Sequence, residues 1–342
     1  MGSPRTEAFA IQEGHSPAKR ALRPNELAPV RGAHRRSAAA SLCLIACLGA
    51  AMTLSQAGCA GKAGSGKKTI VVTYSILGSL VKELVDDRFR TVVSIPDGVD
   101  PRGWEASTAD LATIDKADLV VENGLGLEKG MQRALDQARK GGVKFFTASD
   151  HVLVRTVGMG EGIPSGDPDQ ARGAQDPHLW TDPVTMQAVV DALAEEIDAD
   201  FHVDLSKRRA DLDARLEALD AEIADRVAKI PEERRTLLTG HNSIGYFAQR
   251  YGFKLLGEAS PNDSARAESS AAGLVRLEKL IALDRVSVIF TEIGENPQVA
   301  ETLAKEARVG SVPLATHSLP KGGGYFEFAR GLADTIAEAL SR

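Results

Sequence analysis

The sequence predicts an α/β protein whose two lobes of parallel sheet are joined by a long helix. Short β-branched runs alternate with helical stretches in two separate blocks of the chain, which is typical of parallel βαβ units. Between the blocks, residues 205–227 carry apolar residues at mixed three-, four- and seven-residue spacing among many charges. This pattern favours one uninterrupted helix, and its place between the blocks favours an inter-lobe strut.

The first 58 residues predict a secretory signal. Residues 1–36 are basic and residues 38–54 are free of charge, and small residues then lead to Cys59. The stretch before Cys59 resembles a bacterial lipobox, with Gln56 where leucine is usual, so we expect Cys59 to be the lipidated N-terminus. We therefore expect an exported protein, anchored by lipid on the extracytoplasmic face of the membrane. An uncleaved signal anchor and twin-arginine export, suggested by Arg35-Arg36, are the alternatives.

The composition of the mature chain excludes some partners. All three cysteines, Cys43, Cys47 and Cys59, lie in the signal or at its end, so no disulfide is expected. Residues 1–58 carry seven basic and three acidic residues, so their removal changes the net charge from −6 to −10. This charge disfavours nucleic acid, and membrane attachment rests on the lipid alone. Residues 59–67 are expected to form a flexible tether, and the folded part is expected to be a monomer.

The first lobe is predicted to span residues 68–203. Its expected strands and helices alternate and are followed by an exposed loop at 158–174 and a closing helix at 183–197. The strands are expected at 69–76, 90–95, 118–122 and 143–147, and the earlier helices at 78–86, 108–116 and 127–140.

The linking helix is assigned to residues 204–230 and the second lobe to residues 231–342. The second lobe repeats the alternation of strand and helix. Its strands are expected at 235–239, 254–258, 286–291 and 312–315, and its helices at 244–251, 274–283, 298–307 and 325–340.

Three histidines stand where a metal site is expected. His178 lies in a loop between two Asp-Pro pairs, whereas His241 and His317 each follow an apolar run. Ligand sites of open α/β sheets lie at the carboxyl ends of strands. Three imidazoles that converge there suit zinc better than magnesium or calcium. Glu292 follows the most apolar strand of the second lobe, and it is expected either to supply an oxygen, to orient a ligand or to charge a helix terminus.

The chain from about residue 68 to residue 341 resembles the zinc- and manganese-binding solute-binding lipoproteins of ABC importers, the ZnuA/TroA-like family. The motifs are Asp176-Pro-His-Leu-Trp180 and the stretches 239–252, 290–297 and the closing helix from Tyr325. The resemblance implies two α/β lobes, a rigid linking helix, a metal held between the lobes and an ABC permease as partner. It gives His178 and His241 the role of metal ligands.

Two positions depart from that family. Arg102 stands where the family has its first histidine, and His317 stands where an aspartate is common. A guanidinium has no lone pair to give to a cation. We therefore expect His178, His241 and His317 as ligands, completed by water, by Glu292 or by an anion that pairs with Arg102. Zinc is favoured, and manganese is less favoured.

Other functions compete with metal delivery to a permease. Arg102 favours a repurposed cleft that binds an anion or a metal-chelate, and an adhesin or scaffold role is a further alternative. Three histidines with an open position also describe a hydrolytic zinc site. However, the sequence contains no serine elbow, no His-Glu-x-x-His helix and no phosphate loop, so we do not expect an enzyme.

Overall fold

The structure is a computed structural model that describes residues 66–158, 160–161, 171–256, 271–293 and 297–341. The predicted signal, Cys59 and most of the predicted tether lie outside the described residues. Among the helices of the described part, none combines the length and the apolar character needed to cross a bilayer.

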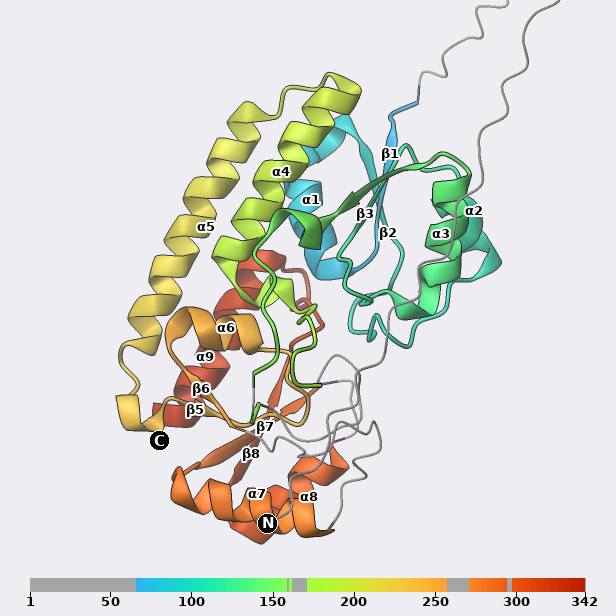
Figure 1. Ribbon diagram of the computed structural model, residues 1–342. Coiled ribbons are helices and arrows are strands. Elements are labelled where there is room, and N and C mark those ends of the chain that lie inside the picture. Colours follow the sequence, from blue (N-terminus) through green and yellow to red (C-terminus); the bar gives the residue numbers. More distant parts are fainter. Residues whose placement is uncertain (1–65, 159, 162–170, 257–270, 294–296, 342) are drawn as a thin grey trace, which may run out of the picture. The chain divides into compact units, whose positions relative to one another are not determined.

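The N-terminal part of the described chain contains a four-stranded parallel sheet with strand order β2-β1-β3-β4. The apolar residues of β1 and β3 are fully buried, as expected for strands that are covered on both faces. Helices α1 and α4 lie on one side of this sheet and α2 and α3 on the other (Figure 1). The elements are β1 (Thr69–Val72), α1 (Ser75–Val85), β2 (Arg90–Val93), α2 (Thr108–Ile114), β3 (Leu119–Glu122), α3 (Gln132–Lys140), β4 (Lys144–Thr147) and α4 (Pro183–Phe201).

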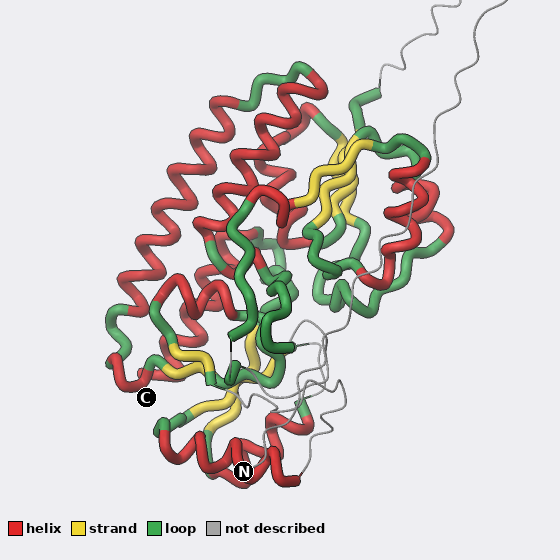
Figure 2. The backbone as a smooth tube through the Cα atoms, in the orientation of Figure 1, coloured by secondary structure: helices red, strands yellow, loops and turns green. Residues whose placement is uncertain are grey.

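The C-terminal part contains two pairs of parallel strands, β5-β6 and β7-β8. A bridge between Thr239 and Phe290 joins the extension of β5 to β7. Figure 2 shows these short strands in yellow near the lower end of the view. The elements are β5 (Thr236–Leu237), α6 (Gly245–Tyr251), β6 (Lys254–Leu255), α7 (Ala271–Leu283), β7 (Val288–Glu292), α8 (Gln298–Ala307), β8 (Gly310–Leu314) and α9 (Tyr325–Ser341).

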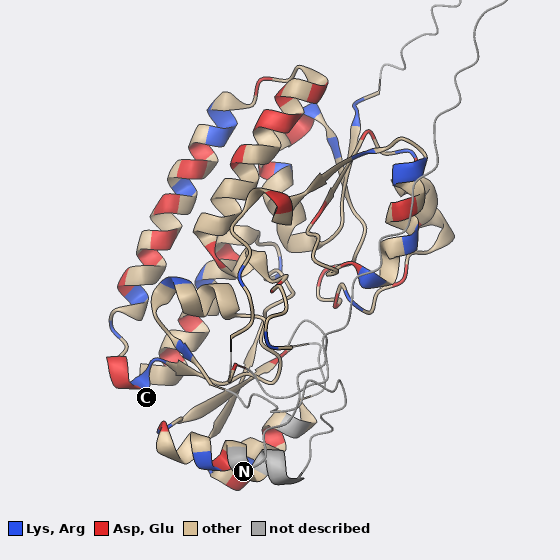
Figure 3. Ribbon diagram, viewed as in Figure 1, with Lys and Arg blue, Asp and Glu red and all other residues tan. Residues whose placement is uncertain are grey.

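Between these parts runs α5 (Ser206–Val227), a helix of 22 residues. Its apolar stripe is buried, and it packs against α1, α4 and α9. Its polar faces carry alternating acidic and basic residues (Figure 3), and Arg226 and Glu222 pair with Asp334 and Arg330 of α9. Helix α5 is therefore attached to elements from both parts of the chain. The division into lobes at 68–203 and 231–342 stays a prediction.

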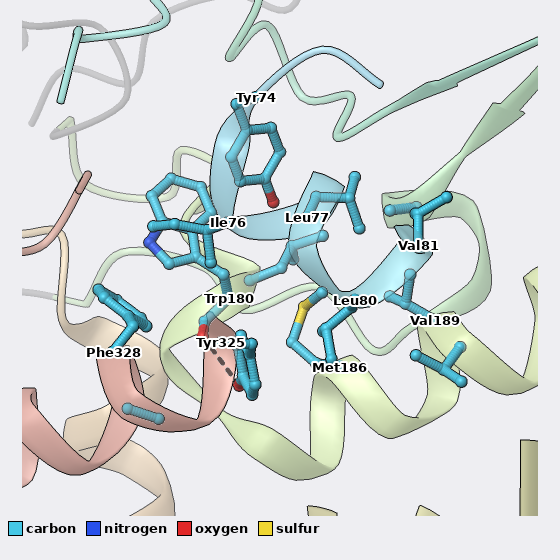
Figure 4. Close-up of a cluster of buried hydrophobic side chains, with 14 of the residues drawn as sticks. Tyr74, Ile76, Leu77, Leu80, Val81, Trp180, Met186, Val189, Tyr325 and Phe328 are labelled. Atoms are coloured by element: carbon cyan, nitrogen blue, oxygen red, sulfur yellow. Dashed lines mark hydrogen bonds between the residues drawn. The ribbon is translucent and has the colours of Figure 1, made fainter. Parts of the chain in front are cut away.

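The main core lies where α1, α4 and α9 meet. Tyr74, Trp180 and Tyr325 are buried together with Leu80 and Met186 (Figure 4). The Tyr325 hydroxyl donates to the Trp180 carbonyl at 3.0 Å. The last helix of the chain thus packs against the residues that immediately follow His178.

The prediction of a strand over residues 69–76 is wrong at its C-terminal end. Strand β1 stops at Val72, and α1 begins at Ser75. The reason is that Ile76 and Leu77 belong to the buried helical stripe of Leu80 and Leu84, whose spacing of three and four residues outweighs the β-branched run before them.

Candidate metal centre

Three imidazole rings meet at the ends of three separate segments. His178 precedes the 3-10 helix Leu179–Thr181, His241 follows β5 and His317 follows β8. The ring centroid of His178 lies 5.1 Å from that of His241 and 5.9 Å from that of His317. All three side chains are buried. The structure therefore brings together the three histidines singled out from the sequence.

His178 is oriented by a carboxylate. Its Nδ1 lies 2.7 Å from Asp176 Oδ1, and its backbone N–H donates to the same oxygen at 3.0 Å. Burial alone raises the pKa of Asp176, but hydrogen bonds from His178 and the positive charge of Arg155 lower that pKa below its usual value. An ionised Asp176 accepts the Nδ1 proton, so the Nε2 lone pair of His178 points to the other side of the ring.

Arg155 holds Asp176 in this role. Its Nη1 lies 2.8 Å from Asp176 Oδ2, and both side chains are buried. A Cβ at Gly245 would lie 2.4 Å from the same carboxylate oxygen and 2.3 Å from Arg155 Nη1. Glycine at the start of α6 is therefore required for this ion pair to pack against the helix. Neither Arg155 nor Gly245 was singled out from the sequence.

Asn123 fixes the backbone beside His178. Its side-chain amide donates to the Pro177 carbonyl at 2.8 Å, and its Oδ1 accepts from the Tyr74 hydroxyl at 3.0 Å. Asn123 follows β3 and Tyr74 follows β1, which are neighbouring strands. The histidine loop is therefore tied to the carboxyl ends of the central strands, where open sheets bind their ligands.

His317 has one hydrogen-bonded and one buried ring nitrogen. Its Nδ1 lies 3.0 Å from the Thr316 hydroxyl and 3.5 Å from Glu292 Oε2. Its Nε2 is buried and has no hydrogen-bond partner among the described residues. Burial lowers the pKa of His317 well below its usual value, and the charge of Arg102 adds to this effect. The direction of this pKa shift favours the neutral form of His317.

Trp180 connects two of the histidine loops. Its ring centroid lies 5.3 Å from that of His178 and 5.5 Å from that of His317, and both contacts are edge-on. Its indole N–H donates to the Thr316 carbonyl at 2.8 Å. This fully buried ring therefore sets the spacing between two of the three imidazoles.

Glu292, at the end of β7, lies behind His317. One of its oxygens accepts from the Ser243 hydroxyl, and the other faces the Nδ1 of His317. The contact with His317 Nδ1, at 3.5 Å, is longer than a normal hydrogen bond, so Glu292 lies beside His317 as a neighbouring charge.

Arg102 lies against the cluster, as the sequence suggests for a residue at the family's first ligand position. Its Nη1 is 3.0 Å from Nε2 and 3.2 Å from Nδ1 of His241. Its Nε pairs with Asp100 at 3.0 and 3.2 Å. Hydrogen bonds from Arg102 and its charge lower the pKa of Asp100, and they outweigh burial, which raises it. An ionised Asp100–Arg102 pair therefore lies beside His241.

The same type of local turn positions the side chains of Arg102 and His178. In both Asp100-Pro-Arg102 and Asp176-Pro-His178, the aspartate accepts from the backbone N–H two residues later at 3.0 Å. It also binds the side chain of that residue. This Asx-type turn is readable in the sequence as a repeated Asp-Pro-X pattern. The repeated pattern is the signal from which Asp100 and Asp176 were predictable.

The spacing of one histidine pair fits a metal ion. The Nε2 atoms of His178 and His241 are 3.2 Å apart. Zinc–nitrogen bonds of about 2.0–2.1 Å at a tetrahedral angle place two ligand atoms about 3.3–3.4 Å apart. Within the described ranges, no group of three or more His, Cys, Asp or Glu side chains already has the arrangement of a metal site. The separation of this pair, which is that of a hydrogen-bonding contact between the two rings, is also compatible with two ligands of one ion.

Known proteins share this fold. The profile of a family described as the periplasmic component A of the zinc-uptake complex, ZnuA, matches residues 70–339. The high-affinity zinc uptake system protein ZnuA of Bacillus subtilis is 28% identical over 314 residues, which cover 88% of this chain and 95% of that protein. The manganese-binding lipoprotein MntA of Halalkalibacterium halodurans is 26% identical, with 82% and 90% covered. The solved structure of the periplasmic zinc-binding protein TroA of Treponema pallidum aligns with a TM-score of 0.68 and 25% identity, and the match covers 81% of this chain and all of that one.

Proposed function

Because the chain belongs to the family of periplasmic zinc-uptake component A proteins, we propose that it captures a divalent transition metal outside the cytoplasm and delivers it to an ABC permease. Zinc is the proposed cargo, and manganese is the less favoured one. The relatives are named as zinc- or manganese-binding proteins, which supports this range of metals.

One observation carries the proposal. The Nε2 atoms of His178 and His241 face each other at about the separation that one tetrahedral ion requires, and a third imidazole, that of His317, lies beside them. Imidazole suits zinc, and three nitrogen ligands favour zinc over manganese in the Irving–Williams order. We assign His178, His241 and His317 as the ligands and Glu292 as the neighbouring charge beside His317.

Calorimetric titration tests this function. We expect the purified chain to bind one zinc ion and to bind manganese more weakly by about a hundredfold or more, because manganese stands at the weak end of the series. The titration is performed in a buffer that does not coordinate metals. Absence of zinc binding, or binding of manganese as tight as that of zinc, would overturn the assignment.

We propose attachment through Cys59. Several relatives are named lipoproteins, which supports this anchoring. A cysteine that carries more than one acyl chain binds a membrane stably, whereas one chain alone binds only marginally. We expect Cys59→Ser to release the protein from the membrane fraction, with Cys43→Ser as the matched control that stays attached. Equal membrane retention of both variants would contradict the proposal.

A further inference from the structure

The loop that carries His317 is held by the N-terminal part of the chain on both sides of the histidine. On one side, the Thr316 carbonyl accepts from the indole N–H of Trp180 at 2.8 Å. On the other side, the Leu319 N–H donates to Asp97 Oδ1 at 2.9 Å, across 222 positions of the sequence. Between the two anchored groups the chain has only His317 and the serine that follows it. The two contacts therefore restrain the backbone from which the imidazole projects.

A turn after β2 presents Asp97 to this loop. The Val99 N–H donates to the Pro96 carbonyl at 3.3 Å, and Gly98 has a φ of +75°. A type II turn requires a positive φ at its third residue, and glycine adopts it without strain. A Cβ at Gly98 would lie 3.7 Å from the Cβ of Ser318, so the turn packs closely against the segment that contains the third histidine.

The same oxygen of Asp97 has a second donor. The Ser75 hydroxyl, at the start of α1, donates to Asp97 Oδ1 at 2.6 Å. The carboxylate is therefore held between α1 and the loop after β8. Hydrogen bonds to a charged acceptor are about twice as strong as neutral ones. Ser75, Asp97 and Leu319 line an open groove beside α1 and α5, and both hydrogen bonds are exposed, so their loss leaves the hydrophobic core intact.

We propose that Asp97 is a positioning residue of the metal centre, which holds His317 where it completes the set of ligands. Asp97 binds the backbone two residues after His317, so it acts through the loop and not on the ion itself. Ordering a free loop costs conformational entropy, and a loop that is already held in place costs less. This inference rests on the proposed function, because it assumes that His317 is a ligand.

Replacing Asp97 with alanine is expected to weaken zinc binding about tenfold, measured by competition with a chelating dye. This is the lower end of the effect of about 10–100-fold for residues that support metal ligands, because Asp97 holds only the loop backbone. Asp97→Asn keeps an oxygen acceptor for both donors and is expected to restore most of the affinity. Asp87→Ala removes an exposed carboxylate from the 3-10 turn before β2, and this control is expected to bind zinc as the wild type does.

A double-mutant cycle with His317→Ala separates positioning from a general effect on the fold. If Asp97 acts through His317, adding Asp97→Ala to His317→Ala has no further effect on zinc affinity. A purely structural role, or a direct effect of the charge on the ion, would weaken zinc binding by the same factor in both backgrounds. Ser75→Ala removes the second donor and is expected to cause a smaller loss of affinity, which also disappears in the His317→Ala background.

The outcomes separate this inference from the function itself. Equal zinc affinities of the wild type and Asp97→Ala, equal losses in Asp97→Asn and Asp97→Ala, or an additive cycle would each overturn the positioning role and leave the metal-binding function intact. Unchanged zinc affinity in His317→Ala would remove the ligand on which the inference depends. Failure of the wild type to bind zinc would overturn the proposed function.

Discussion

Replacing His241 with alanine is expected to weaken zinc binding by about a hundredfold or more. Loss of a residue that only supports a metal ligand typically lowers metal affinity about 10–100-fold, and loss of a ligand itself has the larger effect. His241 forms one half of the pair of nitrogens 3.2 Å apart. Competition with a chelating dye measures the change, because it covers several orders of magnitude in affinity.

His202→Asn is the matched control for this prediction. His202 is exposed and ends α4 in the left-handed conformation, which asparagine also adopts readily. We expect this variant to bind zinc as the wild type does. If His241→Ala and His202→Asn both retained wild-type affinity, the histidine cluster would not be the metal site.

Replacing Trp180 with alanine is expected to destabilise the fold by about 3–5 kcal/mol, the usual range for loss of a large buried aromatic side chain. Trp180 is fully buried, packs against Tyr74 at 5.1 Å and donates to the Thr316 carbonyl. Its loss leaves a cavity and a buried carbonyl without its donor. Urea unfolding followed by circular dichroism measures the change in the free energy of unfolding.

Trp104→Ala is the comparison for this second prediction. Trp104 is the other tryptophan of the chain, and it is only partly buried at the edge of the core. We expect its replacement to have a clearly smaller effect than that of Trp180. Equal losses in the two variants, or a loss below about 1 kcal/mol for Trp180→Ala, would show that Trp180 does not hold the core and the histidine loops together.

Much of the fold was predictable because its signals are local. The β-branched runs around Val71 and Val120 and the apolar stripe of Leu212, Leu216 and Leu219 depend on neighbouring residues alone, and the strands and the long helix form there. The start of α1 was missed because the same apolar residues fit either a buried strand or a helix.

In the candidate site, too, the residues with local sequence signals were predictable and those held by long-range contacts were not. The three histidines were predictable from their places after apolar runs and in a proline-bounded loop. The residues that hold the histidine loop from farther along the chain were not, because Arg155 reaches Asp176 from 21 positions away and Asn123 reaches Pro177 from 54. Such contacts depend on how the loops pack, and a single sequence does not show it. The contact between Arg102 and His241, 139 positions apart, was expected only from the resemblance to the family.

X-ray absorption at the zinc edge of the zinc-loaded chain tests the central claim most directly, because it reports the number and type of atoms bound to the metal. We expect three imidazole nitrogens at about 2.0–2.1 Å and one oxygen at a similar distance. Loss of one imidazole from the spectrum of His317→Ala would identify the third ligand. A wild-type spectrum with two or fewer imidazoles, or with oxygen atoms alone, would contradict the assignment of His178, His241 and His317 as the ligands.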